Sequence, residues 1–118
     1  METELKLSEL KELVTTKDVI VLTSSEVAAV SWLIECYQEN ADIQIIENAH
    51  QLDTEAIVAQ CRDCLSENKK VILTAQFRSQ LPIINLASLC NEKRKSLINI
   101  ELLGWDEETR LPQSYTSF

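Results

Sequence analysis

The chain carries one run that is more informative than any other: Val19-Ile20-Val21-Leu22-Thr23-Ser24-Ser25-Glu26. The unbroken aliphatic residues 19–22 are typical of a parallel β-strand that is buried on both faces. Ser24 or Ser25 can cap a following helix, and Glu26 would lie in its first turn, where a negative charge is favourable. The run therefore predicts a strand that leads directly into a helix.

The turn between this strand and helix lacks the residues that bind phosphate. A phosphate-binding loop needs glycines, because backbone N–H groups must surround the phosphate closely. Residues 23–26 contain neither glycine nor lysine, and the single glycine among the 118 residues is Gly104. A scaffold of this kind without its loop is expected to bind a protein, so we predict no enzyme activity, no cofactor and no metal.

Outside this run, hydrophobic periodicity predicts helices and strands in alternation. A short amphipathic helix over about 5–14 precedes the first strand, and the helix after it ends near Gln38. Further strands are expected at 43–46, 71–73 and 97–102, the last one a candidate edge strand, with helices at 54–66 and from Pro82 to near Lys93. Such alternation predicts a three-layer α/β domain with a mostly parallel sheet. We assign residues 1–104 to this domain and 105–118 to a flexible C-terminal tail.

Composition narrows the classes of function. The formal net charge is −8 and the sequence pI is about 4.6, which argues against a nucleic-acid partner because phosphate contacts supply much of that affinity. No run approaches the roughly 20 apolar residues that span a bilayer. The start, Met1-Glu2-Thr3-Glu4, lacks the pattern of a signal peptide. We therefore expect a cytoplasmic protein with no membrane partner and with reduced cysteines.

One tryptophan does not fit the predicted face of its helix. On a helical wheel Trp32 lies nearly opposite the apolar stripe that should face the sheet, which consists of Val27, Val30, Leu33, Ile34 and Tyr37. Its neighbours on the outer face are small residues. Trp32 is therefore either an exposed hot spot for a protein partner or a residue that another element, such as the N-terminal helix, covers.

Other candidate residues favour plainer interpretations. Cys61 and Cys64 have the spacing of a metal or redox pair, but they lie in mid-helix on the core stripe and are expected to act as small hydrophobic residues. Glu47 and His50 follow the second strand and are interpreted as solvated loop residues. Arg78 lies in the loop after the third strand, where it is either a ligand for a partner's carboxylate or an exposed charge.

The order of these elements resembles a known family, the bacterial SOS cell-division inhibitors of the SulA type. The resemblance covers roughly residues 13–103. It rests on Asp18-Val19-Ile20-Val21-Leu22-Thr23, on Trp32 nine residues later, on the strand that starts at Ile43, on Gln51-Leu52, and on the strands Val71–Ala75 and Leu97–Leu102. The family has a RecA-like fold without a phosphate loop. The resemblance thus implies a three-layer RecA-like or Rossmann-like domain with a mostly parallel sheet of about four strands.

The resemblance also implies a partner and a surface. Family members form dimers and bind FtsZ, which blocks FtsZ polymerisation and its GTPase activity during the SOS response. Leu22 and Trp32 match residues that matter for inhibition, and Lys17 stands where the family has an arginine. Lysine keeps the charge but lacks the planar guanidinium. A family lysine before the second strand corresponds here to Asp42.

Two further implications concern partners. The Lon protease reads the C-terminal tail of family members, and residues 113–118 would serve here in the same way. With Arg78 added, the expected partner-binding residues are Lys17, Leu22, Trp32 and Arg78. The alternative hypothesis is a non-catalytic ATPase-like subunit, related to AAA+ or thymidine-kinase-like proteins, that serves as a scaffold in a larger complex.

Overall fold

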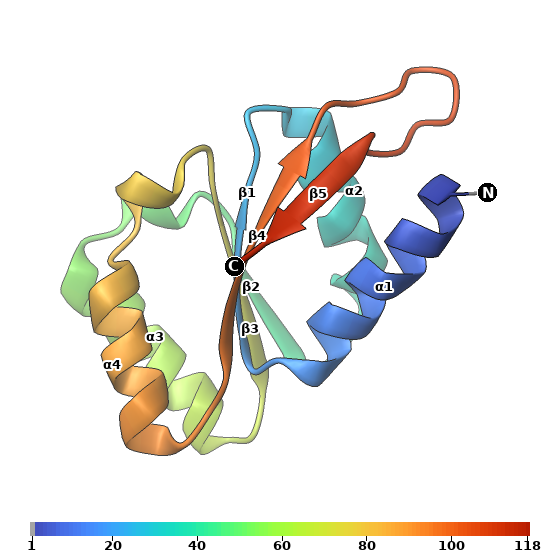
Figure 1. The fold of residues 1–118 in the computed structure, drawn as a ribbon. Coiled ribbons are helices and arrows are strands. Elements are labelled where there is room, and N and C mark those ends of the chain that lie inside the picture. Colours follow the sequence, from blue (N-terminus) through green and yellow to red (C-terminus); the bar gives the residue numbers. More distant parts are fainter. Residues whose placement is uncertain (1) are drawn as a thin grey trace.

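The computed structural model describes residues 2–118, and the side chains from Leu7 onward. Figure 1 shows an α/β fold in which helices and strands alternate along most of the chain. The helices are α1 (Glu2–Thr16), α2 (Val27–Tyr37), α3 (Thr54–Ser66) and α4 (Ile83–Lys93), with short 3-10 turns η1 (Ala49–Gln51) and η2 (Arg78–Gln80). The strands are β1 (Val19–Thr23), β2 (Ile43–Ile46), β3 (Lys70–Ala75), β4 (Leu97–Leu103) and β5 (Ser114–Ser117).

The five strands form one sheet in the order β2-β3-β1-β4-β5. The first four strands are parallel, and β5 pairs with β4 in the antiparallel direction. The sequence thus predicted the class of fold and the mostly parallel sheet correctly. In the described chain β1 lies between β3 and β4, and all five of its residues are buried, as its aliphatic run predicted.

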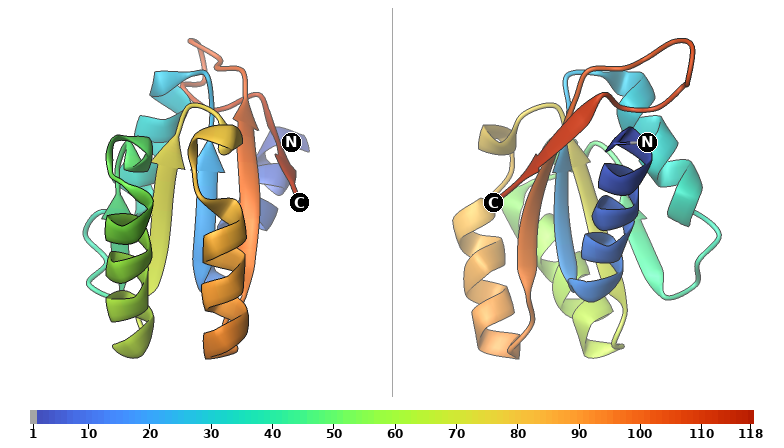
Figure 2. Two further views of the ribbon diagram at one scale, coloured as in Figure 1. Left: turned by 90° about the vertical axis from the view of Figure 1, so that its left-hand side faces the viewer. Right: turned by 45° about the vertical axis from the view of Figure 1, so that its right-hand side comes forward.

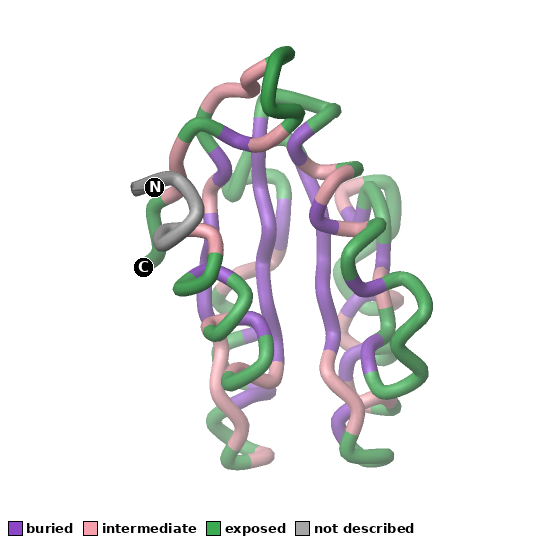
Figure 3. The backbone as a smooth tube through the Cα atoms, turned by 90° about the vertical axis from the view of Figure 1, so that its right-hand side faces the viewer, coloured by how far each residue is buried: buried purple, intermediate pink, exposed green. Residues whose placement is uncertain are grey.

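Helices cover both faces of the sheet, with α1 and α2 on one side and α3 and α4 on the other (Figure 2). Alternate residues of each strand supply the two cores. Ile20 and Leu22 of β1 pack with α1 and α2, whereas Val19 and Val21 pack with α3 and α4. Figure 3 shows that burial is concentrated along the strands and on the sides of the helices that face them.

The C-terminal segment differs from the expectation of a flexible tail. Residues 114–117 form β5, and the backbone of Phe118 exchanges two hydrogen bonds with Asn99, each of 2.9 Å. β4 is therefore an inner strand and not an edge strand. Gly104, at φ +70°, begins the connection from β4 to β5, a backbone conformation that glycine adopts without strain. The polar composition of residues 105–118 could not reveal this pairing, because the hydrogen bonds that stabilise β5 come from β4, a separate segment of the chain.

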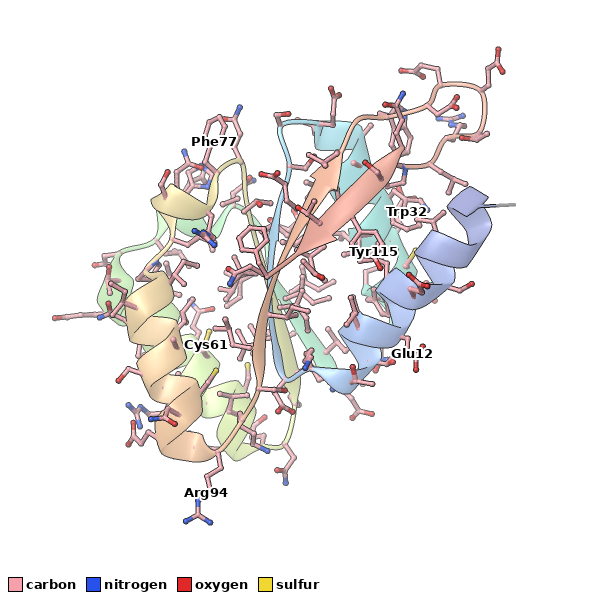
Figure 4. The ribbon with its side chains drawn as sticks, in the orientation of Figure 1. Glu12, Trp32, Cys61, Phe77, Arg94 and Tyr115 are labelled. Atoms are coloured by element: carbon pink, nitrogen blue, oxygen red, sulfur yellow. The ribbon has the colours of Figure 1, made fainter. Side chains whose placement is uncertain are left out.

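Helix α2 buries part of the predicted apolar stripe, namely Leu33 and Tyr37, together with Ala29 from outside it. Val27 of the same stripe is 79% exposed. Trp32 is half-buried and packs against the core that contains residues of α1 and α2, so it is neither a fully exposed hot spot nor a fully buried core residue. Figure 4 shows Trp32 and Tyr115 on the side of the sheet where α1 lies. The buried side of α2 shares one core with α1 and the sheet.

A search of the described residues finds no helix with the length and apolar character that a bilayer crossing requires.

Candidate functional site

The carboxyl ends of the parallel strands gather at one end of the sheet, at the top of both views in Figure 2. After β1 the chain passes to α2 on one face, and after the neighbouring β3 it passes to α4 on the opposite face. In open α/β sheets, ligand sites form where two adjacent strands send their connections to opposite faces. We call this end, with its loops and first helical turns, the carboxyl edge.

Ser24 fixes the turn at the centre of the carboxyl edge. Its hydroxyl donates to the carbonyl of Leu102 at 2.8 Å and accepts from the N–H of Glu26 at 3.0 Å. Its own N–H donates to the carbonyl of Ala75 at 3.4 Å. Ser24 thus links β1 to both neighbouring strands instead of capping α2 by the expected geometry. Two N–H groups that a phosphate loop would direct at a ligand are already used within the protein.

A groove opens beside this turn, between α2 and the ends of β2 and β3. Its volume is about 300 Å³, and Val27, Val30 and Ile34 form its apolar wall. Thr74 and Ala75 line the opposite side, where the Thr74 hydroxyl accepts from the N–H of Asn48 at 2.9 Å. Because α2 turns Ala29 and Leu33 toward the core, Val27 stays exposed on this wall, and Val30 and Ile34 are only partly buried.

Large apolar side chains are exposed mainly at the carboxyl edge. Six of them are clearly exposed among the described side chains, and five lie in segments that end or follow a parallel strand: Val27, Leu52, Phe77, Ile84 and Leu103. The sixth, Phe118, lies under the guanidinium of Arg78, 4.5 Å from its ring centroid. Exposed apolar side chains at this end of the sheet are available for contact with a partner protein. Phe77 projects at this end of the molecule in Figure 4.

The structure separates the four residues expected to bind a partner. Arg78 is exposed at the carboxyl edge. Lys17 lies at the opposite end of the sheet, where its carbonyl accepts from Lys70 Nζ at 2.7 Å. Leu22 is completely buried, so in the folded protein it supports the core and cannot contact a partner.

The cysteines behave as core residues. Burial raises the pKa of Cys61 to about 12 and that of Cys90 to about 11, so both thiols stay protonated at neutral pH. Figure 4 places Cys61 on α3, on the side that faces the sheet. Cys64 is half-buried, so the prediction that both thiols of the pair face the core holds fully for Cys61 and partly for Cys64. Among the described residues, no group of His, Cys, Asp or Glu side chains is arranged to hold a metal ion.

The two loop residues after β2 have different environments. Glu47 is exposed, as predicted, and lines the groove. His50 is only half-exposed, and its Nδ1 atom is buried without a hydrogen-bond partner in the structure. The expectation of a solvated loop is therefore correct for Glu47 and wrong for the His50 ring, because η1 turns back against β3.

Comparison with protein families, with curated proteins and with solved structures finds no match to this chain.

Sequence reasoning missed the groove and the apolar carboxyl edge. One local signal was present: Val27 and Ile84 stand in the first turns of their helices, directly after loops where polar residues are common. The periodicity placed Val27 on the core stripe, so its exposure could not be recognised before the packing of α2 was known.

Proposed function

We propose that this chain is a non-catalytic, protein-binding domain of the SulA type, which binds FtsZ and blocks its polymerisation and GTPase activity. The observation that carries the proposal of protein binding is the group of exposed apolar side chains at the carboxyl edge. The resemblance of the sequence to SulA makes FtsZ the partner to test first.

The arrangement at Ser24 supports a binding role over a hydrolytic one. The turn that would hold a nucleotide's phosphates is joined by hydrogen bonds to Leu102, Glu26 and Ala75. A RecA-like origin agrees with the parallel strands and with helices on both faces. In this proposal the fold keeps the end of the sheet where a nucleotide would bind and uses it for a protein.

The proposed mechanism is occlusion of a polymerisation surface. Phe77 and Val27 would supply apolar contact area, and Arg78 would pair with a carboxylate of the partner. Because Arg78 already stacks on Phe118, its guanidinium is held in place before binding, which lowers the entropic cost of ordering it. Trp32 would act indirectly, through the packing of α2 against α1.

Two other partners follow from the resemblance. A homodimer is part of the proposal. Recognition of the C-terminal segment by Lon would require β5 to separate from β4 first, because residues 114–117 are paired in the folded protein.

The experiment is a titration of the protein into FtsZ from the same organism, with GTPase activity and sedimentation of polymers as readouts. Phe77→Ala should weaken inhibition by roughly 30- to 1000-fold, which corresponds to the loss of about 2–4 kcal/mol typical of a central aromatic contact. Because the Phe77 side chain is 52% exposed, its truncation should leave the fold intact. Lys69→Ala, at the other end of the sheet, is the control and should inhibit like the parent.

Absence of any effect on FtsZ at excess protein would reject this partner. The alternative is then a scaffold subunit that binds an ATPase through the same edge. This alternative is favoured by the position of the edge, at the end of the sheet where nucleotides typically bind. That function predicts stable co-purification with an ATPase, and loss of this complex in Phe77→Ala.

A further inference from the structure

Strand β2 is one edge of the sheet and has a neighbour, β3, on one side only. The N–H of Lys70 donates to the carbonyl of Asp42 at 2.8 Å, and Ile43 is paired with Lys70. Main-chain groups alternate in direction along a strand, so those of Gln44 and Ile46 face β3 and those of Ile43 and Ile45 face outward. The N–H of Ile43 donates to Asn40 at 3.1 Å, which leaves the N–H of Ile45 directed to the outside of the sheet.

The groove described above continues along this edge. A second hollow of about 360 Å³ is lined by α2 and β2 and shares Ile34, Gln38 and Glu47 with the first. Along one side of the combined groove, Val27, Val30 and Ile34 stand at helical spacing. An open strand edge beside an apolar wall has the two features that extended peptides use: main-chain pairing for affinity and pockets for alternate side chains.

The charges along the groove favour one kind of protein segment as its occupant. Glu35 and Glu47 line the groove, and neither Lys nor Arg is among the residues that line its two parts. The whole chain has a net charge of −8, so a second copy paired along β2 would bring like charges together. A segment with lysine or arginine would instead be attracted, most strongly at low ionic strength.

We propose that the groove between α2 and the free edge of β2 binds an extended, basic segment of a partner protein, which adds to the sheet as a sixth strand. Alternate apolar side chains of the segment pack on Val27, Val30 and Ile34, and its cationic side chains reach Glu35 and Glu47. This inference rests on the proposed function only in taking the chain to be a protein-binding domain. It does not require the partner to be FtsZ.

The test uses a defined probe, a peptide of about eight alternating valine and lysine residues, which is the length of an ordinary strand. The peptide is titrated into the full, ¹⁵N-labelled chain and followed by NMR. We expect saturable chemical-shift changes that are confined to α2, β2 and residues 74–75. We also expect slower hydrogen exchange of the Ile45 amide. A peptide of alternating valine and glutamate is the matched control and should produce no shifts.

Three variants locate the site. Val27→Lys places a charge on the apolar wall at an exposed position, and Glu47→Lys reverses a charge at the groove. Ile45→Pro removes the outward N–H, and proline is tolerated where an edge-strand N–H faces away from the sheet. Each should weaken binding of the valine-lysine peptide about tenfold or more, equivalent to about 1.4 kcal/mol. Glu12→Lys, on the exposed side of α1, changes the net charge by the same amount as Glu47→Lys and should bind like the parent.

Several results would overturn the proposal. Shifts spread over the acidic surface and unchanged in Val27→Lys would mean non-specific attraction. No shift at millimolar peptide would mean that the edge does not accept a strand. Protection of Ile45 in the free protein, together with a dimer in sedimentation equilibrium, would assign the edge to a second copy. Because the peptide assay contains no FtsZ, its failure and the failure of FtsZ inhibition are separate results.

Discussion

Asp18 joins the amino ends of β1 and β4. Its Oδ2 atom accepts from the N–H of Ser96 at 2.9 Å and from the Ser96 hydroxyl at 3.1 Å. Burial of the carboxyl opposes its ionisation, but the Ser96 hydrogen bonds and the charges of Lys70 and Lys95 outweigh burial and lower its pKa from 3.8. The ionised form is therefore the one that holds the two strands together.

We expect Asp18→Ala to lower the free energy of unfolding by about 1–2 kcal/mol at pH 7, because two hydrogen bonds to a charged group are lost. A folded-state pKa below the unfolded value gives stability that is present above the unfolded pKa and disappears as pH falls through the folded pKa. The difference from the parent should therefore shrink below pH 3.8. Urea unfolding at a series of pH values measures it.

Asp42→Ala is the control for this variant, because the exposed Asp42 side chain has no hydrogen bond recorded in the structure. An equal loss of stability in both variants, or a loss that does not change with pH, would contradict the assigned role of Asp18.

The four thiols should differ sharply in reactivity. At pH 8 a disulfide reagent is expected to modify the exposed Cys36 first, and Cys61 and Cys90 only when the protein unfolds, because burial keeps both thiols protonated. The folded-state pKa values of Cys61 and Cys90 are raised above the ordinary value of about 9. The stability that these two protonated thiols contribute is therefore lost as pH rises from about 9 toward 11 for Cys90 and 12 for Cys61. Cys36→Ser should remove the fast phase, and a fast reaction of Cys61 would refute its buried position.

At the scale of elements, the strands followed closely from the sequence. The strand at 43–46 has the predicted bounds, and the aliphatic run at 19–22 forms the buried centre of the sheet. These strands can be recognised from short runs of sequence, because a parallel strand that is covered on both faces consists largely of apolar residues. The orientation of α2 followed only in part, because a helix that is apolar on several sides can bury more than one of them: Leu33 and Tyr37 are buried as predicted, but Val27 is not.

The pairing of β5 gives a test with a matched control. The reciprocal hydrogen bonds of Phe118 with Asn99 mean that the N–H of Thr116 faces β4, while that of Ser117 faces outward. Thr116→Pro should therefore reduce the free energy of unfolding by about 1–2 kcal/mol through the lost ladder bond. Ser117→Pro should have little effect.

Chemical denaturation measures both β5 variants, and hydrogen exchange of the β4 amides reports whether the strand remains paired. Equal stabilities of the two proline variants would mean that β5 does not stay on the sheet in solution, as expected for a flexible tail.

At the scale of the whole molecule, the carboxyl edge combines parallel strands whose connections go to opposite faces with a turn that lacks glycine and uses the N–H groups of Ser24 and Glu26 within the protein. We therefore expect ATP or GTP with Mg²⁺ to leave the melting temperature unchanged. A ligand present at a hundred times its dissociation constant would add about 2.7 kcal/mol of stability, which would raise Tm by several degrees. Differential scanning fluorimetry detects such a rise, and a reproducible one would contradict the proposal that this edge binds a protein instead of a nucleotide.

The arrangement of the whole molecule also shows which residues of the candidate site could be placed from the sequence. Arg78 was placed correctly at the end of the third strand, because the carboxyl end of a parallel strand is fixed by its direction. Lys17 and Leu22 lie close to each other in sequence, yet one is at the opposite end of the sheet and the other is in the core. A linear pattern records their spacing but not their exposure.

The sequence by itself determined the α/β class, the buried parallel strands and the absence of a glycine-rich phosphate loop, because each depends on residues close together in the chain. Only the tertiary structure decided which apolar residues of α2 are buried, the partial burial of Trp32, the pairing of β5 and the open groove beside β2. These features depend on which distant elements compete for the same apolar surface. A periodic pattern shows that a side chain favours burial, but the packed neighbours decide whether any space in the core remains for it.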